Sequence, residues 1–309
     1  ALVAFIHPSQ AHGVLVELQE KPAMGPTLRV GRHTMGDLTL TALHDGPIWL
    51  DGGAMFGVVP RELWGRVTVP DTRNRVPMAM RPLLVQGPWG GLLIDCGAGD
   101  KGTPRWRDMY GLGPRGTLDA ALAEAGASET TIEAVLATHL HFDHIGGATV
   151  VEGGRLRPRF PRARHLIRRQ EWDDATHPHE RSRASYRPDD ILPLLEAGTV
   201  DFFDADGEIR PGVRVERTGG HTRQHQIVYL QSGGRTAVVA ADLVPTTAHL
   251  PDAWIAGYDL FPMETLAVKK RLLQEAVERE YLVCFAHDPH VAAGYVREAN
   301  GRRYVEPVL

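Results

Sequence analysis

The stretch THLHFDHIGG, residues 138–147, places His139, His141, Asp143 and His144 within six residues. This cluster constrains the fold most, because imidazole and carboxylate groups are the usual nitrogen and oxygen ligands of zinc and similar ions. In an extended segment residues i and i+2 share a face, so His139 and His141 can bind one ion together. After a turn, Asp143 and His144 would point to a second place nearby. The cluster predicts a site for two metal ions; the alternative is a polar loop whose histidines face water.

Three residues downstream could complete such a site. His221 follows the glycine pair of RTGGH, Asp242 follows the apolar run TAVVAA, and His287 follows the apolar strand pattern VCFA. A carboxylate at the end of an apolar strand is costly to bury unless it pairs with a cation. Its two oxygens would let Asp242 bridge two ions. His290 is a second candidate beside His287, but it follows Pro289 in an expected loop.

Strand and helix patterns succeed one another along the chain. GTLDAALAEAG (116–126) predicts a helix, and the apolar stripe of METLAVKKRLLQEAVERE (263–280) predicts another. PLLVQ and GGLLIDCG are expected to pair as inner strands. This order indicates sheets covered by helices in an α/β domain. KPAMGPT has two prolines and a glycine, so we expect a strand segment and linker over 1–27 and one domain over 28–309.

Composition excludes several other classes. The chain has 309 residues and a formal net charge of −4, so the overall balance favours neither nucleic acid nor an anionic membrane as a partner. Seven arginines lie between Arg155 and Arg169, but Phe160 is the only aromatic residue among them. We interpret this run as a solvated strand edge. Cys96 and Cys284 lie in apolar stretches and are expected to be buried free thiols, in a reducing and therefore cytoplasmic setting.

The series of metal-binding residues resembles the metallo-β-lactamase superfamily, whose H-x-H-x-D-H motif is followed by a distant His, Asp and His. LLIDCGAG also resembles the Asp-containing strand end of that family, which would put Asp95 near the site. The resemblance implies an αββα four-layer sandwich with two divalent metal ions per chain at one edge, zinc first, with Mn, Fe or Co as alternatives. It implies one ion held by His139, His141 and His221, another held by Asp143, His144 and His287, and Asp242 as the bridge.

The resemblance also implies a dinuclear metal-dependent hydrolase, in which hydroxide between the ions attacks an ester, lactone or phosphotriester. Asp143 would relay a proton, and Asp242 would hold the ions together. The lactonase and methyl-parathion-hydrolase-like branch is the most similar, although its lactonases commonly carry Tyr where this chain has Pro245. Three alternatives stay open: a glyoxalase II-like thioesterase, a mononuclear iron persulfide dioxygenase, and a non-catalytic metal-stabilised binding protein.

A substrate pocket is expected from methionine and aromatic residues in two Gly/Pro-rich, apparently irregular segments, 51–65 and 74–82, and in the segment after Asp242. A pocket lined by these residues would favour a small, neutral substrate with a hydrophobic tail. The alternative is that these residues pack in the core. No nucleic-acid or membrane partner is expected, and a homodimer stays open. The candidate pocket residues are Met55, Phe56, Trp64, Met80, His249 and Tyr258.

The opening stretch VAFIHPSQAHGVLVELQE resembles the last strands of a methylmalonyl-CoA epimerase. Glu17 falls where that family has a metal-binding Glu, but the other ligands of that site are absent from the sequence. We therefore expect no epimerase activity from this segment.

Overall fold

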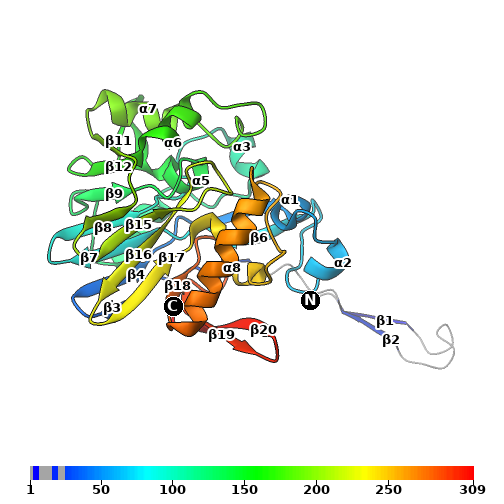
Figure 1. The fold of residues 1–309 in the computed structure, drawn as a ribbon. Coiled ribbons are helices and arrows are strands. Elements are labelled where there is room, and N and C mark those ends of the chain that lie inside the picture. The colour runs from blue at the N-terminus through cyan, green and yellow to red at the C-terminus, as the bar shows by residue number, and fades with distance from the viewer. Residues whose placement is uncertain (1–2, 7–15, 20–24) are drawn as a thin grey trace.

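The computed structural model describes residues 3–6, 16–19 and 25–309. Most of the epimerase-like stretch and the first part of the expected linker lie outside these residues. At the centre are two seven-stranded sheets (Figure 1). The first has the order β13-β12-β9-β8-β7-β4-β3. Its strands are β3 (Gly31–Met35), β4 (Leu38–Ala42), β7 (Leu83–Gly87), β8 (Gly90–Ile94), β9 (Ala134–Leu136), β12 (Arg164–Arg168) and β13 (Val200–Phe203).

The second sheet follows the chain, in the order β14 to β20. Its strands are antiparallel to their neighbours except β17 and β18, which are parallel and are connected through α8. The strands are β14 (Gly207–Arg210), β15 (Val213–Arg217), β16 (Gln226–Ser232), β17 (Arg235–Val239), β18 (Leu282–Cys284), β19 (Ala293–Ala299) and β20 (Arg302–Pro307).

Helices cover the outer faces of both sheets (Figure 1). Those on the side of the first sheet include α4, α6 and α7, and α8 lies on the second. The predicted helices 116–126 and 263–280 are confirmed as α4 and α8, with ends within two residues. The helices are α1 (Gly52–Phe56), α2 (Arg61–Trp64), α3 (Pro104–Met109), α4 (Thr117–Glu124), α5 (Phe142–Ile145), α6 (Arg169–Thr176), α7 (Pro188–Glu196) and α8 (Pro262–Glu278).

Short elements complete the described part of the chain. Three two-stranded antiparallel sheets stand outside the two main sheets, and three single 3₁₀ turns lie in the loops. They are β1 (Val3–Ile6) with β2 (Val16–Gln19), β5 (Pro47–Asp51) with β6 (Arg75–Ala79), β10 (Thr149–Glu152) with β11 (Arg155–Pro158), and the turns η2 (Gly146–Ala148), η3 (Ala241–Leu243) and η4 (Thr247–His249).

The layers follow from the alternation of apolar residues in the strands. In the expected β7–β8 pair, which is confirmed, Leu84 lies opposite Leu93 and both pack against the helices of the first outer layer. Their neighbours Leu83 and Leu92 point the other way and pack between the two sheets. Successive side chains of a strand face opposite sides, so one strand contributes to both cores. The predicted αββα sandwich is confirmed.

The arginine-rich run matches its interpretation as a solvated strand edge only in part, because Arg155, Arg162, Arg164 and Arg169 are exposed but two other arginines are buried. Arg159 is buried and donates to Asp100 at 2.6 Å and to Asp119 at 2.5 Å. Arg168 is also buried and pairs with Asp206. A buried guanidinium needs such partners, and these lie far away in the sequence. Cys96 and Cys284 are buried free thiols, as predicted. Within the described residues, no helix has the length and apolar character needed to cross a membrane.

Candidate metal centre

Parallel strands bring the first loop of the site to one sheet edge. β9 lies parallel to β8, so the residues that follow these strands meet at the same edge. Asp95, directly after β8, accepts from the backbone N–H of Thr138 at 2.8 Å and from its hydroxyl at 2.8 Å. His139 follows Thr138, and His141 lies just before α5, which carries Asp143 and His144. The packing of two adjacent strands therefore positions the whole motif.

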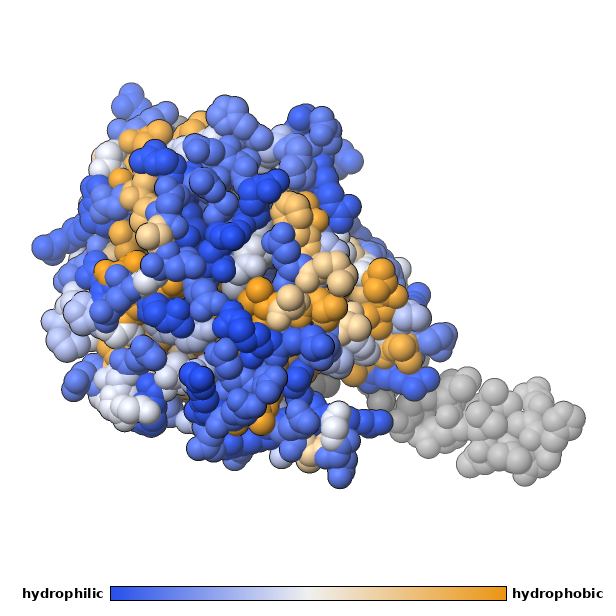
Figure 2. Space-filling view, in the orientation of Figure 1, coloured by the Kyte–Doolittle hydropathy of each residue, from blue (hydrophilic) through white to orange (hydrophobic). Residues whose placement is uncertain are grey.

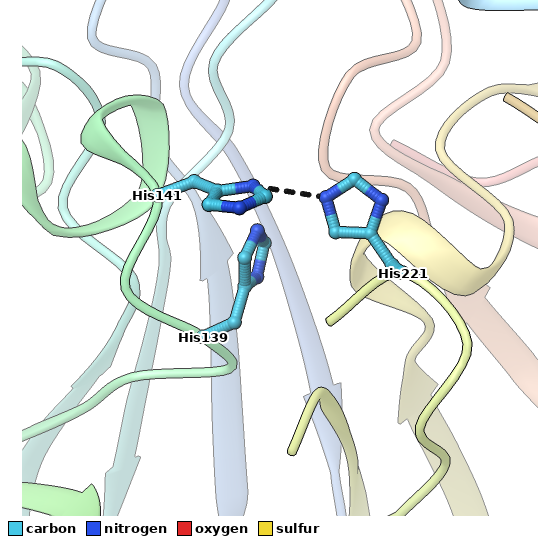
Figure 3. A group of neighbouring side chains, drawn as sticks. All are labelled: His139, His141 and His221. Carbon is cyan, nitrogen blue, oxygen red and sulfur yellow. Dashed lines mark hydrogen bonds between the residues drawn. The ribbon is translucent and has the colours of Figure 1, made fainter. Parts of the chain in front are cut away.

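Three histidines form a group that could hold one metal ion, and we name this group, His139, His141 and His221, half-site one. The rings of the first two come from one segment, and His221 faces them from another (Figure 3). Nε2 of His221 lies 3.0 Å from Nδ1 of His141, and one ring nitrogen from each of the three lies within 4.8 Å of the others. Gly220 has a φ of +83°, and a Cβ there would lie 2.3 Å from the Thr265 hydroxyl oxygen, so glycine is needed directly before His221.

A second group that could hold a metal ion is named half-site two, and it consists of Asp143, His144 and His287. Nε2 of His287 lies 3.0 Å from Nε2 of His144 and 3.7 Å from Oδ2 of Asp143. The three ligand atoms lie within 4.8 Å of one another. His287 follows β18, so the second sheet completes a group that begins in the first.

Asp242 lies between the two half-sites. Its Oδ2 is 3.0 Å from Nε2 of His221 and 3.9 Å from Nε2 of His139, both in half-site one. Its Oδ1 is 3.2 Å from Nε2 of His144 and 3.1 Å from Nε2 of His287, both in half-site two. Each oxygen of one carboxylate thus faces a different set of histidines.

Hydrogen bonds to the far side of the rings fix the direction of several ligands. Nδ1 of His221 lies 2.9 Å from Asp259, Nδ1 of His144 lies 2.9 Å from Asp95, and Nδ1 of His287 lies 3.0 Å from the Ala79 carbonyl oxygen. Carboxylate and carbonyl oxygens accept, so the Nδ1 atoms are the donors and each Nε2 lone pair points into the site. Such partners orient histidine ligands and raise their basicity.

The charges at the site fit two divalent cations. Burial lowers the pKa of both His139 and His141 well below the ordinary value, and their Nε2 atoms are buried without a hydrogen-bond partner among the described residues. Burial opposes the charged form of His144 as well, but Asp242 and Asp95 raise its pKa well above the ordinary value. The site combines the neutral imidazoles of His139 and His141 with carboxylates that attract positive charge. This set of nitrogen and oxygen donors suits zinc and related ions.

A family model described as the metallo-beta-lactamase superfamily matches residues 83–287, which is more than half of the chain and includes all seven of these residues. The chain belongs to this superfamily. An N-acyl homoserine lactonase of Bacillus thuringiensis is 29% identical over 158 residues, 50% of this chain and 55% of that protein. The chain thus spans about half the length of the first curated relatives it matches.

Solved structures of other proteins are similar over most of the chain. A probable metal-dependent hydrolase from Staphylococcus aureus is 30% identical with a TM-score of 0.82, and the match covers 90% of this chain and all (100%) of that one. A dizinc quorum-quenching lactonase in complex with a product is 21% identical with a TM-score of 0.74, covering 91% of this chain and 97% of that one. At this lower identity the likeness concerns the fold alone.

Three further histidines belong to neither half-site. Nε2 of His225 accepts from the backbone N–H of Asp242 at 3.1 Å, so this ring holds the bridging residue in place. His290 lies apart from both half-sites, with Nδ1 3.2 Å from the Thr27 hydroxyl oxygen. His249 stacks on Phe56 with ring centroids 4.9 Å apart, and its Nε2 donates to the Met55 carbonyl oxygen.

The expected pocket residues divide between two cavities and the core. Met55 and Tyr258 line a cavity of about 130 Å³ that also contains Asp143, Asp242 and His287. Phe56 and His249 line a neighbouring cavity of about 620 Å³. Trp64 and Met80 line neither cavity and are buried in an apolar cluster beside them.

The backbone around these residues also differs from the expectation. The segments 51–65 and 74–82 were expected to be irregular, but they form α1, α2 and β6. β6 contains Pro77, which a two-stranded sheet tolerates because each of its strands is an edge.

Several residues around the site gave no pattern in the sequence. Asp259 supports His221, and Glu171 of α6 accepts from residues beside three ligands. Arg181, Ser185 and Tyr110 line the smaller cavity. In the sequence, Glu171 follows several arginines and has the pattern of a surface residue. The pairing of Asp259 with His221 depends on how distant loops fold, so the sequence did not indicate it.

Proposed function

We propose that this protein is a dinuclear metal-dependent hydrolase that acts on neutral lactones or esters with an apolar arm. The observation that supports it best is the position of Asp242, with one oxygen toward each half-site. Both half-sites contribute residues to the same small cavity, as His141, Asp143, His221 and His287 all line it. A structural zinc ion is normally enclosed by four ligands, whereas a reactive centre needs an open side.

When bound, two divalent ions acidify a water molecule and polarise the oxygen of the substrate. The side chain of Asp143 is 11% exposed and borders the cavity, so its carboxylate can accept a proton from a water molecule there and pass it to the leaving oxygen. The hydroxyl-bearing residues Tyr110, Ser185 and Tyr258 line the same cavity and are available to orient a substrate by hydrogen bonds.

Two adjacent cavities suggest the shape of the substrate. The cavity at the metal centre, about 130 Å³, suits only the reacting group, whereas the neighbouring cavity of about 620 Å³ could hold a longer arm. Both cavities share Met55 and Met78, and methionine side chains adapt to ligands of different shape. On the face in view, apolar residues gather around α1 and α2 (Figure 2). Of these two helices, α1 contributes Met55 and Phe56 to the cavities.

The relatives named N-acyl homoserine lactonase favour a lactone as the first substrate class to test. Pro245 lines the smaller cavity at the position where lactonases commonly carry Tyr, so the contacts to the substrate must differ here. Tyr110 and Tyr258 line the same cavity and offer phenol groups from other segments.

The test is a hydrolysis screen of zinc-loaded protein on lactones, aryl esters, thioesters and phosphotriesters, followed by a series of increasing alkyl length. We expect kcat/KM to rise by up to about fourfold per methylene, which corresponds to about 0.8 kcal/mol of burial, until the cavity is full. Ala248→Trp, in the larger cavity only, should reduce this rise and spare short substrates. Ala184→Trp, in the smaller cavity only, should reduce activity at every length.

A preference for short, charged acyl groups would contradict the apolar arm. Activity restricted to thioesters would favour the glyoxalase II-like alternative. Binding of a single iron with consumption of oxygen would favour a persulfide dioxygenase, and two bound ions without any hydrolysis would favour a metal-stabilised binding protein.

A further inference from the structure

Glu171 is a buried carboxylate at the beginning of α6, close to half-site one. Its side chain is 2% exposed and accepts three hydrogen bonds. Oε1 accepts from the Leu140 backbone N–H at 3.0 Å and from the Tyr186 hydroxyl at 3.2 Å, and Oε2 accepts from the Thr222 hydroxyl at 2.8 Å. Burying a carboxylate is costly, so three donors aimed at one such group indicate a specific role.

The donors to Glu171 are neighbours of the ligands of half-site one. Leu140 lies between His139 and His141 in the sequence, and Thr222 directly follows His221. One carboxylate therefore connects the two loops whose histidines must converge on one ion. The two loops belong to opposite halves of the sandwich. Gln226, at the start of β16, connects the same halves by donating to the Thr138 carbonyl oxygen at 3.1 Å and to the Ala137 carbonyl oxygen at 2.7 Å, but it does not contact the loop of His221 through these bonds.

Tyr186 extends this connection to a ligand ring. Its ring lies edge-on to the ring of His141, with centroids 4.9 Å apart, while its hydroxyl donates to Glu171. The ring of His141 thus rests on a side chain that the same carboxylate holds. Among the described residues, Nε2 of His141 has no hydrogen-bond partner, so packing against Tyr186 restricts the direction of this ring.

We propose that Glu171 is a positioning residue for half-site one, which holds the loops of His139, His141 and His221 at metal-binding separation before the ion arrives. It touches neither the ion nor the substrate. This inference rests on the proposed two-metal centre and assigns a specific residue to the organisation of one half of it. Hydrogen-bond partners that orient ligands typically change metal affinity by about 10–100-fold, and we expect an effect of this size on half-site one alone.

The test is zinc affinity, measured by competition with a chromophoric chelator in two backgrounds that each retain one half-site. In His287→Ala protein, adding Glu171→Ala should weaken zinc binding by about 10–100-fold. In His221→Ala protein, the same change should alter the affinity of half-site two by less than about threefold, since no residue next to Asp143, His144 or His287 donates to Glu171. Leu122→Ala, a buried change in α4, is the control for a general loss of stability.

Two milder variants separate positioning from bulk stability. Glu171→Gln keeps the shape and one acceptor oxygen for Leu140, so it should recover most of the zinc affinity lost in Glu171→Ala. Thr222→Val removes only the hydrogen bond on the side of His221 and should cause an intermediate loss. If Glu171→Ala does not fold, the zinc affinities of these two variants are compared with that of wild-type protein instead.

Equal weakening of both half-sites, a matching loss in Leu122→Ala, or unchanged affinity in Glu171→Ala and Thr222→Val would overturn the inference. If wild-type protein binds two zinc ions and these variants bind zinc with unchanged affinity, only the proposed role of Glu171 is wrong. If wild-type protein does not bind two ions, the proposed centre fails, and the role of Glu171 fails with it.

Discussion

The two half-sites share a bridging carboxylate but are supported differently. In half-site one, His221 donates to the carboxylate of Asp259, and the two ligand loops meet at Glu171. In half-site two, His144 donates to Asp95, but His287 donates to the neutral carbonyl of Ala79. Anionic acceptors make stronger hydrogen bonds to a histidine ligand than a neutral carbonyl does.

Ligands of both half-sites border the cavity, but half-site two includes the more exposed one. The side chain of Asp143 is 11% exposed, whereas His141 is 8% exposed and the side chains of His139 and His221 are at most 3% exposed. The difference suggests a division of labour, in which half-site one retains its ion and half-site two presents its ion to the substrate. Each prediction below tests this asymmetry, beginning with the largest effect.

Loss of the bridge should have the largest effect. Asp242→Ala removes the negative charge between the two half-sites, and we expect activity to fall by more than the about 100-fold upper range for partners of metal ligands. His249→Ala is the control, because His249 donates to a carbonyl and stacks on Phe56 without facing either half-site. The test is to measure the hydrolysis rate and the zinc content of both variants. Wild-type activity in Asp242→Ala at full zinc content would remove this residue from the centre.

Graded chelation should empty the half-sites in order. We expect half-site two to lose its ion first, leaving protein with one ion and little activity. Complete removal should lower the melting temperature, because an ion at 100 times its dissociation constant stabilises the fold by about 2.7 kcal/mol. Calorimetry and metal analysis at each chelator concentration measure both effects. Identical melting of chelated and loaded protein, or simultaneous loss of both ions, would contradict the asymmetry.

Neutralising the carboxylates behind the histidines should have a smaller effect. Asp259→Asn keeps an oxygen that can accept from Nδ1 of His221 but removes its charge. Asp95→Asn removes the charge and one of the two acceptor oxygens that Thr138 and His144 share. We expect Asp259→Asn to weaken half-site one, and Asp95→Asn to weaken mainly half-site two, each by about tenfold. Zinc titration of both variants distinguishes the sites. The asymmetry is wrong if both changes weaken the same half-site.

Sequence patterns were sufficient to predict the layers of the fold and the candidate metal ligands that lie together. Strand alternation and the helical stripe of 263–280 depend on local periodicity, so β7, β8 and α8 could be predicted. The seven ligands follow apolar strands or lie in one short motif, and the structure brings all seven together. Local order along the chain is enough for such features, because a strand end fixes where its next residue points.

The residues that support the ligands could not be predicted in this way. Glu171 and Asp259 meet the ligand loops only after distant segments fold together, and neither lies in a motif. Burial of Arg159 depends on Asp100 and Asp119, which are 40 or more residues away. α1 and α2 arise in a Gly/Pro-rich stretch, where packing around Trp64 outweighs weak local preference.

The most direct test of the two-metal centre is native mass spectrometry of zinc-loaded protein. We expect two zinc ions per wild-type chain, and one ion each in His221→Ala and His287→Ala, because these substitutions affect different half-sites. Ala248→Trp, outside both half-sites, should retain two. A single ion in wild-type protein, lost entirely in both histidine variants, would contradict the two half-sites and leave one mononuclear site in their place.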